Sequence, residues 1–237
     1  MDENKKYAIS LFGEFVDKST ENEFLEHSMN SYSKSIGVVA LIFGLISMLF
    51  LSTDYYDVAR PISFLIITAL RVFFLIASIA IFFIAKQETK FTGFIYLITV
   101  YESIAALTFL LILGQYDSLS YLSVLSLMAV TLAIYILPNK MKFCQLISIA
   151  MSLLFFLYPG QKIEGLVEYD LYKLMAYQSI LLTYCNINSS LTNSYKRKQF
   201  TGSKELLALS VTDPLTGIYN RTKFDEEVDR WMNFSHR

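Results

Sequence analysis

Two charged residues, Arg71 and Glu102, lie inside long apolar stretches of the sequence. A charge near the middle of a bilayer costs at least about 2.5–3.5 kcal/mol on insertion scales, so such residues usually pair or serve a function. Counted at the helical rise from the lysines that follow or precede their stretches, Arg71 lies roughly 22 Å and Glu102 roughly 18 Å from the same membrane edge. This similar depth predicts an ion pair that joins two adjacent antiparallel helices.

Other interpretations of these two charges stay open. Arg71 can extend its side chain toward the membrane surface while Glu102 is protonated, without any contact between them. Both residues can also line the pathway of a small transporter or channel. We expect a structural pair rather than a ligand site.

The remaining chemistry-bearing residues are few. His27 and His236 lie outside the apolar stretches, so a haem or metal ion held between membrane histidines is not expected. Cys144 and Cys185 fall within apolar segments, where buried thiols are more typical than a disulfide. The sequence therefore predicts no catalytic, cofactor-binding or metal-binding residue.

Six apolar segments account for the elements that would position Arg71 and Glu102. Charged residues make up only 17% of the chain, against about 25% in an average soluble domain. A membrane-spanning helix needs about 17–25 mostly apolar residues. The segments that approach or meet this length are 36–52, 62–85, 94–114, 119–137, 143–158 and 171–191. The fifth is short, and the sixth contains Lys173, Gln178, Asn186 and Asn188, yet together they predict an all-α polytopic membrane bundle.

The positive charges between these segments predict how the bundle is oriented. Lysines and arginines concentrate in cytoplasmic loops of membrane proteins. They concentrate here after the second, fourth and sixth segments, as Lys86 and Lys90, Lys140 and Lys142, and Lys196 to Lys198, whereas the other loops contain only Arg60 and Lys162. The intervening loops are mainly acidic. We therefore expect a multi-pass protein of the cell membrane with both termini in the cytoplasm.

The chain divides by composition into four predicted parts. Residues 1–34 form a cytoplasmic lead-in, 35–191 the membrane bundle, 192–212 a linker or signalling helix, and 213–237 a short tail. In the lead-in, Phe12, Phe15 and Phe24 belong either to short helices lying against the membrane or to a partly disordered segment. The helix over 204–211 either pairs with its copy in a second subunit or packs on its own domain.

The tail has the pattern of a turn followed by a new helix. Asp213 and Pro214 suit the start of a turn, Gly217 permits a backbone conformation that other residues avoid, and Asn220 is a good N-cap. After Asn220, apolar residues recur at the spacing of one helix face; they are Phe224, Val228, Trp231 and Met232.

The run LALSVTDPLTGIYNRTKF closely resembles the opening of GGDEF domains, the catalytic domains of diguanylate cyclases. Those domains begin with a helix, a D-x-L-T-G-L-x-N-R turn and a second helix. The matching residues are Asp213, Leu215, Thr216, Gly217, Asn220 and Arg221, with Ile218 in place of a leucine. The resemblance implies a membrane-bound diguanylate cyclase with an α/β GGDEF domain, which works as a homodimer and condenses two GTP to cyclic di-GMP with Mg²⁺.

The sequence departs from that family where the chemistry takes place. The family's metal-binding carboxylates and its GG(D/E)EF turn lie downstream of the opening turn, and no such string occurs in these 237 residues. Phosphoryl chemistry with two metal ions requires the carboxylates that hold the ions. The sequence therefore predicts the sensory half of a cyclase truncated just after its GGDEF domain begins, without cyclase activity, cofactor or bound GTP. Its expected partners are the lipid bilayer and a second copy, and not nucleic acid.

Overall fold

The computed structural model describes residues 7–10, 13–87, 91–211, 218, 220, 223–224, 228 and 230–232. Within these residues every regular element is a helix, and extended backbone pairs only at two isolated bridges. The chain separates into two compact units. Leu25–Ser190 form the first, here called the bundle unit, and Met1–Phe24 with Leu191–Arg237 form the second, here called the terminal unit.

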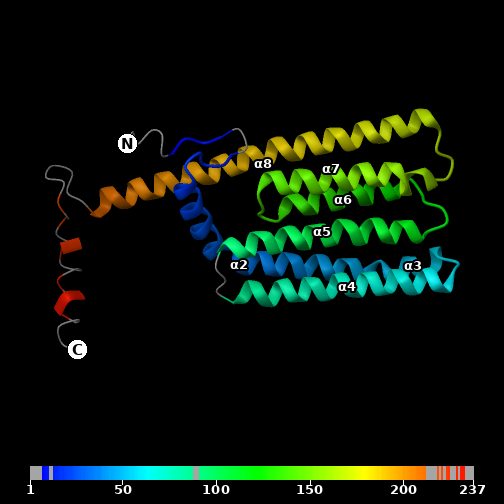
Figure 1. The fold of residues 1–237 in the computed structure, drawn as a ribbon, viewed down its shortest axis with the longest axis horizontal. Helices are drawn as coiled ribbons and strands as arrows, with labels where there is room; N and C mark the ends of the chain where they lie inside the picture. Colours follow the sequence, from blue (N-terminus) through cyan, green and yellow to red (C-terminus); the bar gives the residue numbers. More distant parts are fainter. Residues whose placement is uncertain are drawn as a thin grey trace. The chain divides into compact units, whose positions relative to one another are not determined.

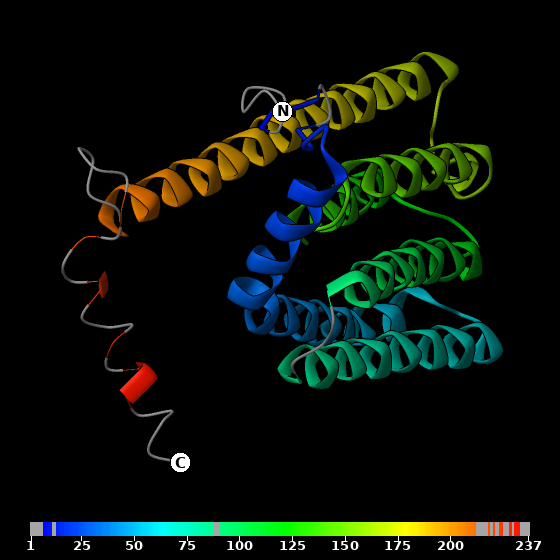
Figure 2. The same cartoon turned by 60° about the vertical axis from the view of Figure 1, so that its left-hand side comes forward.

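The helices follow the predicted apolar segments closely. Their bounds are α2 Lys18–Leu49, α3 Leu51–Asp57, α4 Pro61–Lys86, α5 Phe91–Gln115, α6 Leu122–Ile136, α7 Met141–Leu157, the short 3-10 helix η1 Pro159–Lys162, and α8 Glu168–Val211. Figures 1 and 2 show α4, α5, α6 and α7 lying alongside one another in the bundle unit. The prediction of an all-helical chain is confirmed for the described residues.

Four stretches are long and apolar enough to cross a membrane, by length and composition. They are Tyr32–Asp57, Pro61–Lys86, Gly93–Gln115 and Met141–Lys162. The predicted fourth segment corresponds to α6, which is apolar but has 15 residues. The predicted sixth segment lies in α8, whose composition is more polar. Among the described residues, four helices thus have the length and composition of the spans of a multi-pass membrane protein.

Prolines mark several of the helix ends. Pro61 is the first residue of α4, where its missing N–H costs no hydrogen bond. Pro138 follows α6, and Pro159 opens the 3-10 turn after α7. Because the residue before a proline avoids helical backbone angles, the chain turns at these points and the following helix returns through the bundle.

The helix of the first apolar stretch is interrupted at Phe50, between α2 and α3. The hydroxyls of Ser52 and Thr53 donate to the carbonyls of Leu49 and Phe50, at 2.9 and 2.8 Å. Such bonds from serine and threonine back to the preceding turn are associated with bent helices. The helical character resumes in α3 and continues to Asp57, so that Asp54 belongs to a helix instead of a loop.

Helices α2 and α4 approach each other closely along small residues. A Cβ atom added at Gly44 would lie 2.6 Å from the Cβ of Ser78, and one added at Gly37 would lie 2.9 Å from that of Ala85. Ala40, between the two glycines, is completely buried. These three small residues therefore mark a close contact between two helices of one chain.

The polar residues of α8 that weakened the sixth predicted segment include two that bond to neighbouring helices. The Gln178 amide donates at 2.9 Å to both the Thr131 hydroxyl of α6 and the Ser152 hydroxyl of α7. The Tyr135 hydroxyl of α6 donates to the Asn186 side chain at 2.7 Å. These bonds hold residues 178–186 of α8 within the bundle unit.

The terminal unit is organised around one buried ion pair. The Arg197 guanidinium donates to both carboxylate oxygens of Glu21, at 2.5 and 2.9 Å. It also lies over the ring of Phe24, 4.4 Å from its centroid. Phe15 and Phe24 pack against Phe200, with ring centroids 6.5 and 5.5 Å from it. The lead-in phenylalanines Phe15 and Phe24 thus pack inside this unit, while Phe12 lies outside the described residues.

Candidate functional site

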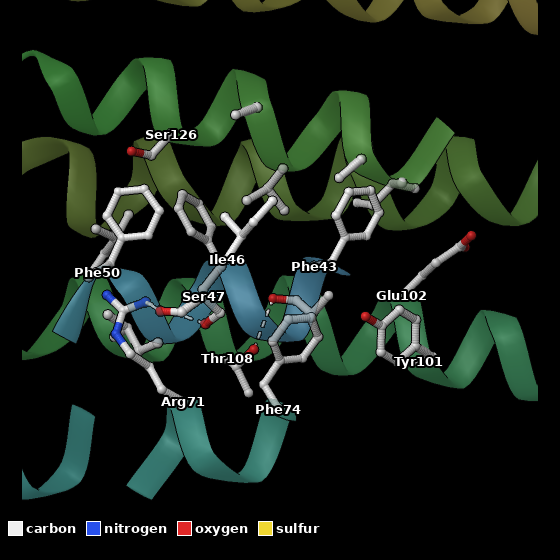
Figure 3. A pocket seen from close by; sticks show the side chains of 18 of the residues that line it. Phe43, Ile46, Ser47, Phe50, Arg71, Phe74, Tyr101, Glu102, Thr108 and Ser126 are labelled. Carbon is white, nitrogen blue, oxygen red and sulfur yellow. Dashed lines mark hydrogen bonds between the residues drawn. The ribbon is translucent and has the colours of Figure 1, made fainter. Parts of the chain in front are cut away.

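A cavity of about 410 Å³ opens inside the bundle unit between α2, α3, α4, α5 and α6 (Figure 3). Its walls are mainly apolar and include the rings of Phe43, Phe50, Phe74 and Phe109. The charged exceptions lie in two places: an ion pair that involves Arg71, and the carboxylate of Glu102. Few polar groups in an apolar, concave surface are typical of small-molecule sites.

The first polar group is an ion pair between Arg71 of α4 and Asp54 of α3. The guanidinium Nε and Nη2 donate to the two carboxylate oxygens at 2.5 and 2.9 Å. Its Nη1 donates to the backbone carbonyl of Ser47 in α2 at 2.8 Å, the contact drawn in Figure 3. Asp54 is completely buried and Arg71 nearly so. A bidentate pair of this kind neutralises both charges and joins three helical segments.

This pairing corrects the predicted partner of Arg71. The sequence predicts an Arg71–Glu102 pair, but the guanidinium is bound by Asp54 instead. The reason is that helical structure resumes in α3 after Phe50, and Asp54 of α3 lies beside Arg71 on the neighbouring helix. Arg71 and Glu102 both line the cavity, where Figure 3 shows them well apart along its length.

Tyr116, just after α5, completes the cluster at Asp54. Its hydroxyl donates a short hydrogen bond to the Asp54 carboxylate. Burial, together with the hydrogen bond to Asp54 and the charge of that carboxylate, raises the pKa of the Tyr116 phenol. The phenol therefore stays protonated at neutral pH and remains a donor. Asp54 thus accepts bonds from the side chains of both Arg71 and Tyr116.

Only one of the two carboxylate oxygens of Glu102 in α5 has a hydrogen-bond partner among the described residues. Its side chain is 1% exposed, and its Oε2 accepts a hydrogen bond from the Asn139 amide at 2.8 Å. Its Oε1 is buried and has no hydrogen-bond partner among the described residues. A buried acceptor without a partner is uncommon in native structures and calls for an explanation. Asn139 is itself held by Thr99, whose hydroxyl lies 2.9 Å from its amide nitrogen.

Tyr101, which precedes Glu102 in α5, connects this helix to α2 and α4. The Tyr101 hydroxyl donates to the Ala40 carbonyl of α2 at 3.1 Å and lies 3.1 Å from the Ser78 hydroxyl of α4. Its ring stacks on Phe74, with centroids 5.4 Å apart. The cavity wall near Glu102 is therefore held by contacts of Tyr101 with the backbone of α2 and with two side chains of α4.

The GGDEF-like tail falls mostly beyond what the structure describes. Asp213, Leu215, Thr216, Gly217 and Arg221 lie outside the described residues. Asn220 is described, and its side-chain oxygen accepts a hydrogen bond from the Lys223 backbone N–H at 3.0 Å. This is the contact expected of an N-cap, so that part of the prediction is confirmed.

Two further observations bear on possible chemistry. Among the described residues, no group of three or more histidine, cysteine, aspartate or glutamate side chains is placed to hold a metal ion. Cys144 and Cys185 are buried free thiols, as the sequence predicts.

A comparison with known protein families finds no match for this chain, and a search of curated proteins finds none either.

Sequence reasoning misses several residues of the site. The pattern of apolar segments places Asp54 and Tyr116 in loops, and Asn139 follows Pro138 in a predicted turn. The signal that could have found them is position, because each lies within a few residues of the end of an apolar segment. Polar side chains at such positions can turn back into the bundle and satisfy a buried charge.

Proposed function

We propose that this chain is the membrane-embedded sensory and anchoring region of a diguanylate cyclase of the GGDEF type. In this proposal six helices cross the cell membrane, both termini are cytoplasmic, and the 237 residues have no cyclase activity of their own. A stimulus acting on the bundle would alter α8 and, through it, the way two catalytic domains face each other.

The observation that carries the proposal is the continuity of α8. This helix runs without interruption from Glu168 to Val211, two residues before the GGDEF-like turn begins at Asp213. Residues in its first half bond to α6 and α7 around the bundle, as Gln178 and Asn186 show. A continuous helix that begins in a membrane bundle and ends at a catalytic domain can pass a change in the bundle to that domain.

The bonds of Gln178 and Asn186 also support a sixth membrane span. Polar side chains within spanning helices usually face other helices and bond to them. Many exposed residues of the same segment are apolar or aromatic, which suits lipid; Tyr177, Ile180 and Tyr184 are examples. With α8 as a span, the lysines and arginines of alternate loops all fall on the cytoplasmic side.

A homodimer is the expected assembly of such a sensor, and α8 offers a suitable face. Exposed apolar side chains recur along it at alternating intervals of three and four residues, the spacing of a coiled-coil seam. They are Tyr177, Ile180, Tyr184, Ile187 and Leu191, each more than half exposed.

A chimaera tests the coupling. Residues 1–212 are joined to a complete GGDEF domain of an active cyclase at the shared D-x-L-T-G turn, and cyclic di-GMP is measured in cells. One to seven residues are then inserted after Ser203 in α8, and each rotates the domain by about 100°. We expect activity to fall and recover with the helical period, so that the seven-residue insertion resembles the uninserted chimaera.

An activity that ignores the insertions would refute coupling through α8. As a matched control, the same residues are inserted in the turn after Asp213, where no continuous helix is expected and no periodic response should follow.

The cavity favours one other function, a small transporter or channel that uses Arg71 and Glu102. The observation in its favour is that both residues line a single cavity. Against it, Arg71 is already neutralised by Asp54. Flux of a small amine or of protons into protein-containing liposomes, lost in a Glu102→Gln variant, would support this alternative over the sensor.

A further inference from the structure

The shape and lining of the cavity in the bundle unit point to a small, mostly apolar occupant. The volume of about 410 Å³ lies within the range of sites that hold drug-sized ligands. Phenylalanine rings from α2, α4 and α5 form much of the wall. Flat apolar or aromatic bodies pack well against such rings.

The charges around the cavity point to the polar end of that occupant. Arg71 and Asp54 neutralise each other through two hydrogen bonds, so this pair contributes no net charge. Glu102 receives one hydrogen bond from a neutral amide, and its second oxygen is unpartnered among the described residues. The acidic group that is left to be matched at the cavity is therefore Glu102.

We propose that this cavity binds a small apolar molecule that carries a protonated amine. The ammonium group binds Oε1 of Glu102, and the apolar body lies against the rings of Phe43 and Phe74. An ammonium ion supplies the hydrogen-bond donor and the opposite charge that the Glu102 carboxylate lacks. The adjacent Tyr101 ring offers a further attraction for a cation.

That the amine acts as the stimulus rests on the proposed sensory function. The proposal that the cavity binds an amine does not depend on that function. Tyr101 links the wall beside Glu102 to α2 and α4 through Ala40 and Ser78. An amine bound at Glu102 would therefore affect the contacts that join α5 to α2 and α4.

A fluorescent amine tests binding directly on the full chain in lipid nanodiscs. The probe is dansylcadaverine, whose dansyl group brightens and shifts to the blue in apolar sites. The comparison probe is the dansyl amide of 5-aminopentanol, in which a hydroxyl replaces the amine. Empty nanodiscs measure partition into lipid. We expect saturable binding of the amine and much weaker binding of the alcohol.

The decisive variant is Glu102→Gln, which keeps the shape of the side chain and removes its charge. Loss of one partner of a buried charge pair should weaken amine binding by about thirtyfold or more. Glu168→Gln is the matched control, because Glu168 is an exposed carboxylate at the start of α8 and does not line the cavity. Its binding should equal that of the unaltered chain.

A second variant tests the cavity without touching the charge. Ala105→Leu adds bulk to the lining one turn from Glu102 and should weaken the amine and alcohol probes alike. Equal binding of both probes to the unaltered chain, or unchanged amine binding in Glu102→Gln, would overturn the inference. Binding that depends on Glu102 supports it even if the chimaera fails to signal, in which case the sensory proposal alone is lost.

Discussion

Removing the charge of Glu21 should loosen the terminal unit. The Glu21 carboxylate binds Arg197 through two hydrogen bonds and also accepts one from the Phe15 backbone N–H at 2.8 Å. The side chains of Arg197 and Glu21 are only 5% and 12% exposed. Breaking a buried pair on one side leaves an uncompensated charge and costs about 3–5 kcal/mol. Because glutamine keeps part of the hydrogen bonding, we expect about 3 kcal/mol for Glu21→Gln, at the lower end of that range.

Hydrogen exchange of the backbone amides in 13–24 measures this loss. When exchange follows local opening, about 3 kcal/mol corresponds to exchange roughly a hundredfold faster. Glu23→Gln is the matched control, because Glu23 pairs with Lys204 between the same two helices but is about half exposed. An exposed pair contributes about 0.2–1 kcal/mol, which is a change of less than about sixfold.

Comparing the two substitutions therefore separates the effect of losing a buried ion pair from the effect of losing an exposed one. If Glu21→Gln speeds exchange no more than Glu23→Gln, the buried pair with Arg197 does not hold the terminal unit together. The fallback explanation would then be the packing of Phe15 and Phe24 on Phe200, which Phe200→Ala would test in the same assay.

Three further substitutions test the bundle unit, each followed by thermal unfolding in detergent. Gly44→Leu should prevent α2 from approaching α4 at Ser78 and destabilise by several kcal/mol, whereas an unchanged midpoint would show that the helices can separate without loss. Asp54→Asn leaves the Arg71 charge buried without its partner and should cost about 3–5 kcal/mol, with Asp54→Asn/Arg71→Met recovering part of it if the pair is real. Gln178→Leu removes two bonds between helices and should cost about 1–2 kcal/mol; a stabilised variant would argue against them.

The sequence predicts the helices of the bundle well because their causes are local. Apolar runs set where α4 and α5 lie, and prolines mark where α4 begins and where α6 and α7 end. The cap of the last predicted helix also follows from one residue, Asn220, whose side chain needs only a backbone N–H three positions on. None of these features depends on which helices become neighbours.

The partners of buried polar groups cannot be predicted in this way. Depth along a helix places Arg71 near Glu102, but it carries no information on the short helix α3, in which Asp54 lies beside Arg71. For the same reason, the sequence alone shows Gln178 only as a polar residue that weakens the prediction of an apolar span. The structure shows that its amide donates hydrogen bonds to Thr131 and Ser152 on neighbouring helices.

Arg71 and Glu102 are equally conspicuous in the sequence, but the structure gives them different surroundings. Arg71 is paired with Asp54 through two hydrogen bonds, so its removal should destabilise the fold. Glu102 keeps a buried oxygen without a partner among the described residues, which is a standing cost to the fold. Glutamine at this position should therefore leave the unfolding midpoint unchanged or raise it, even as it weakens amine binding. Groups that serve binding at the expense of stability behave in this way, and structural ion pairs do not.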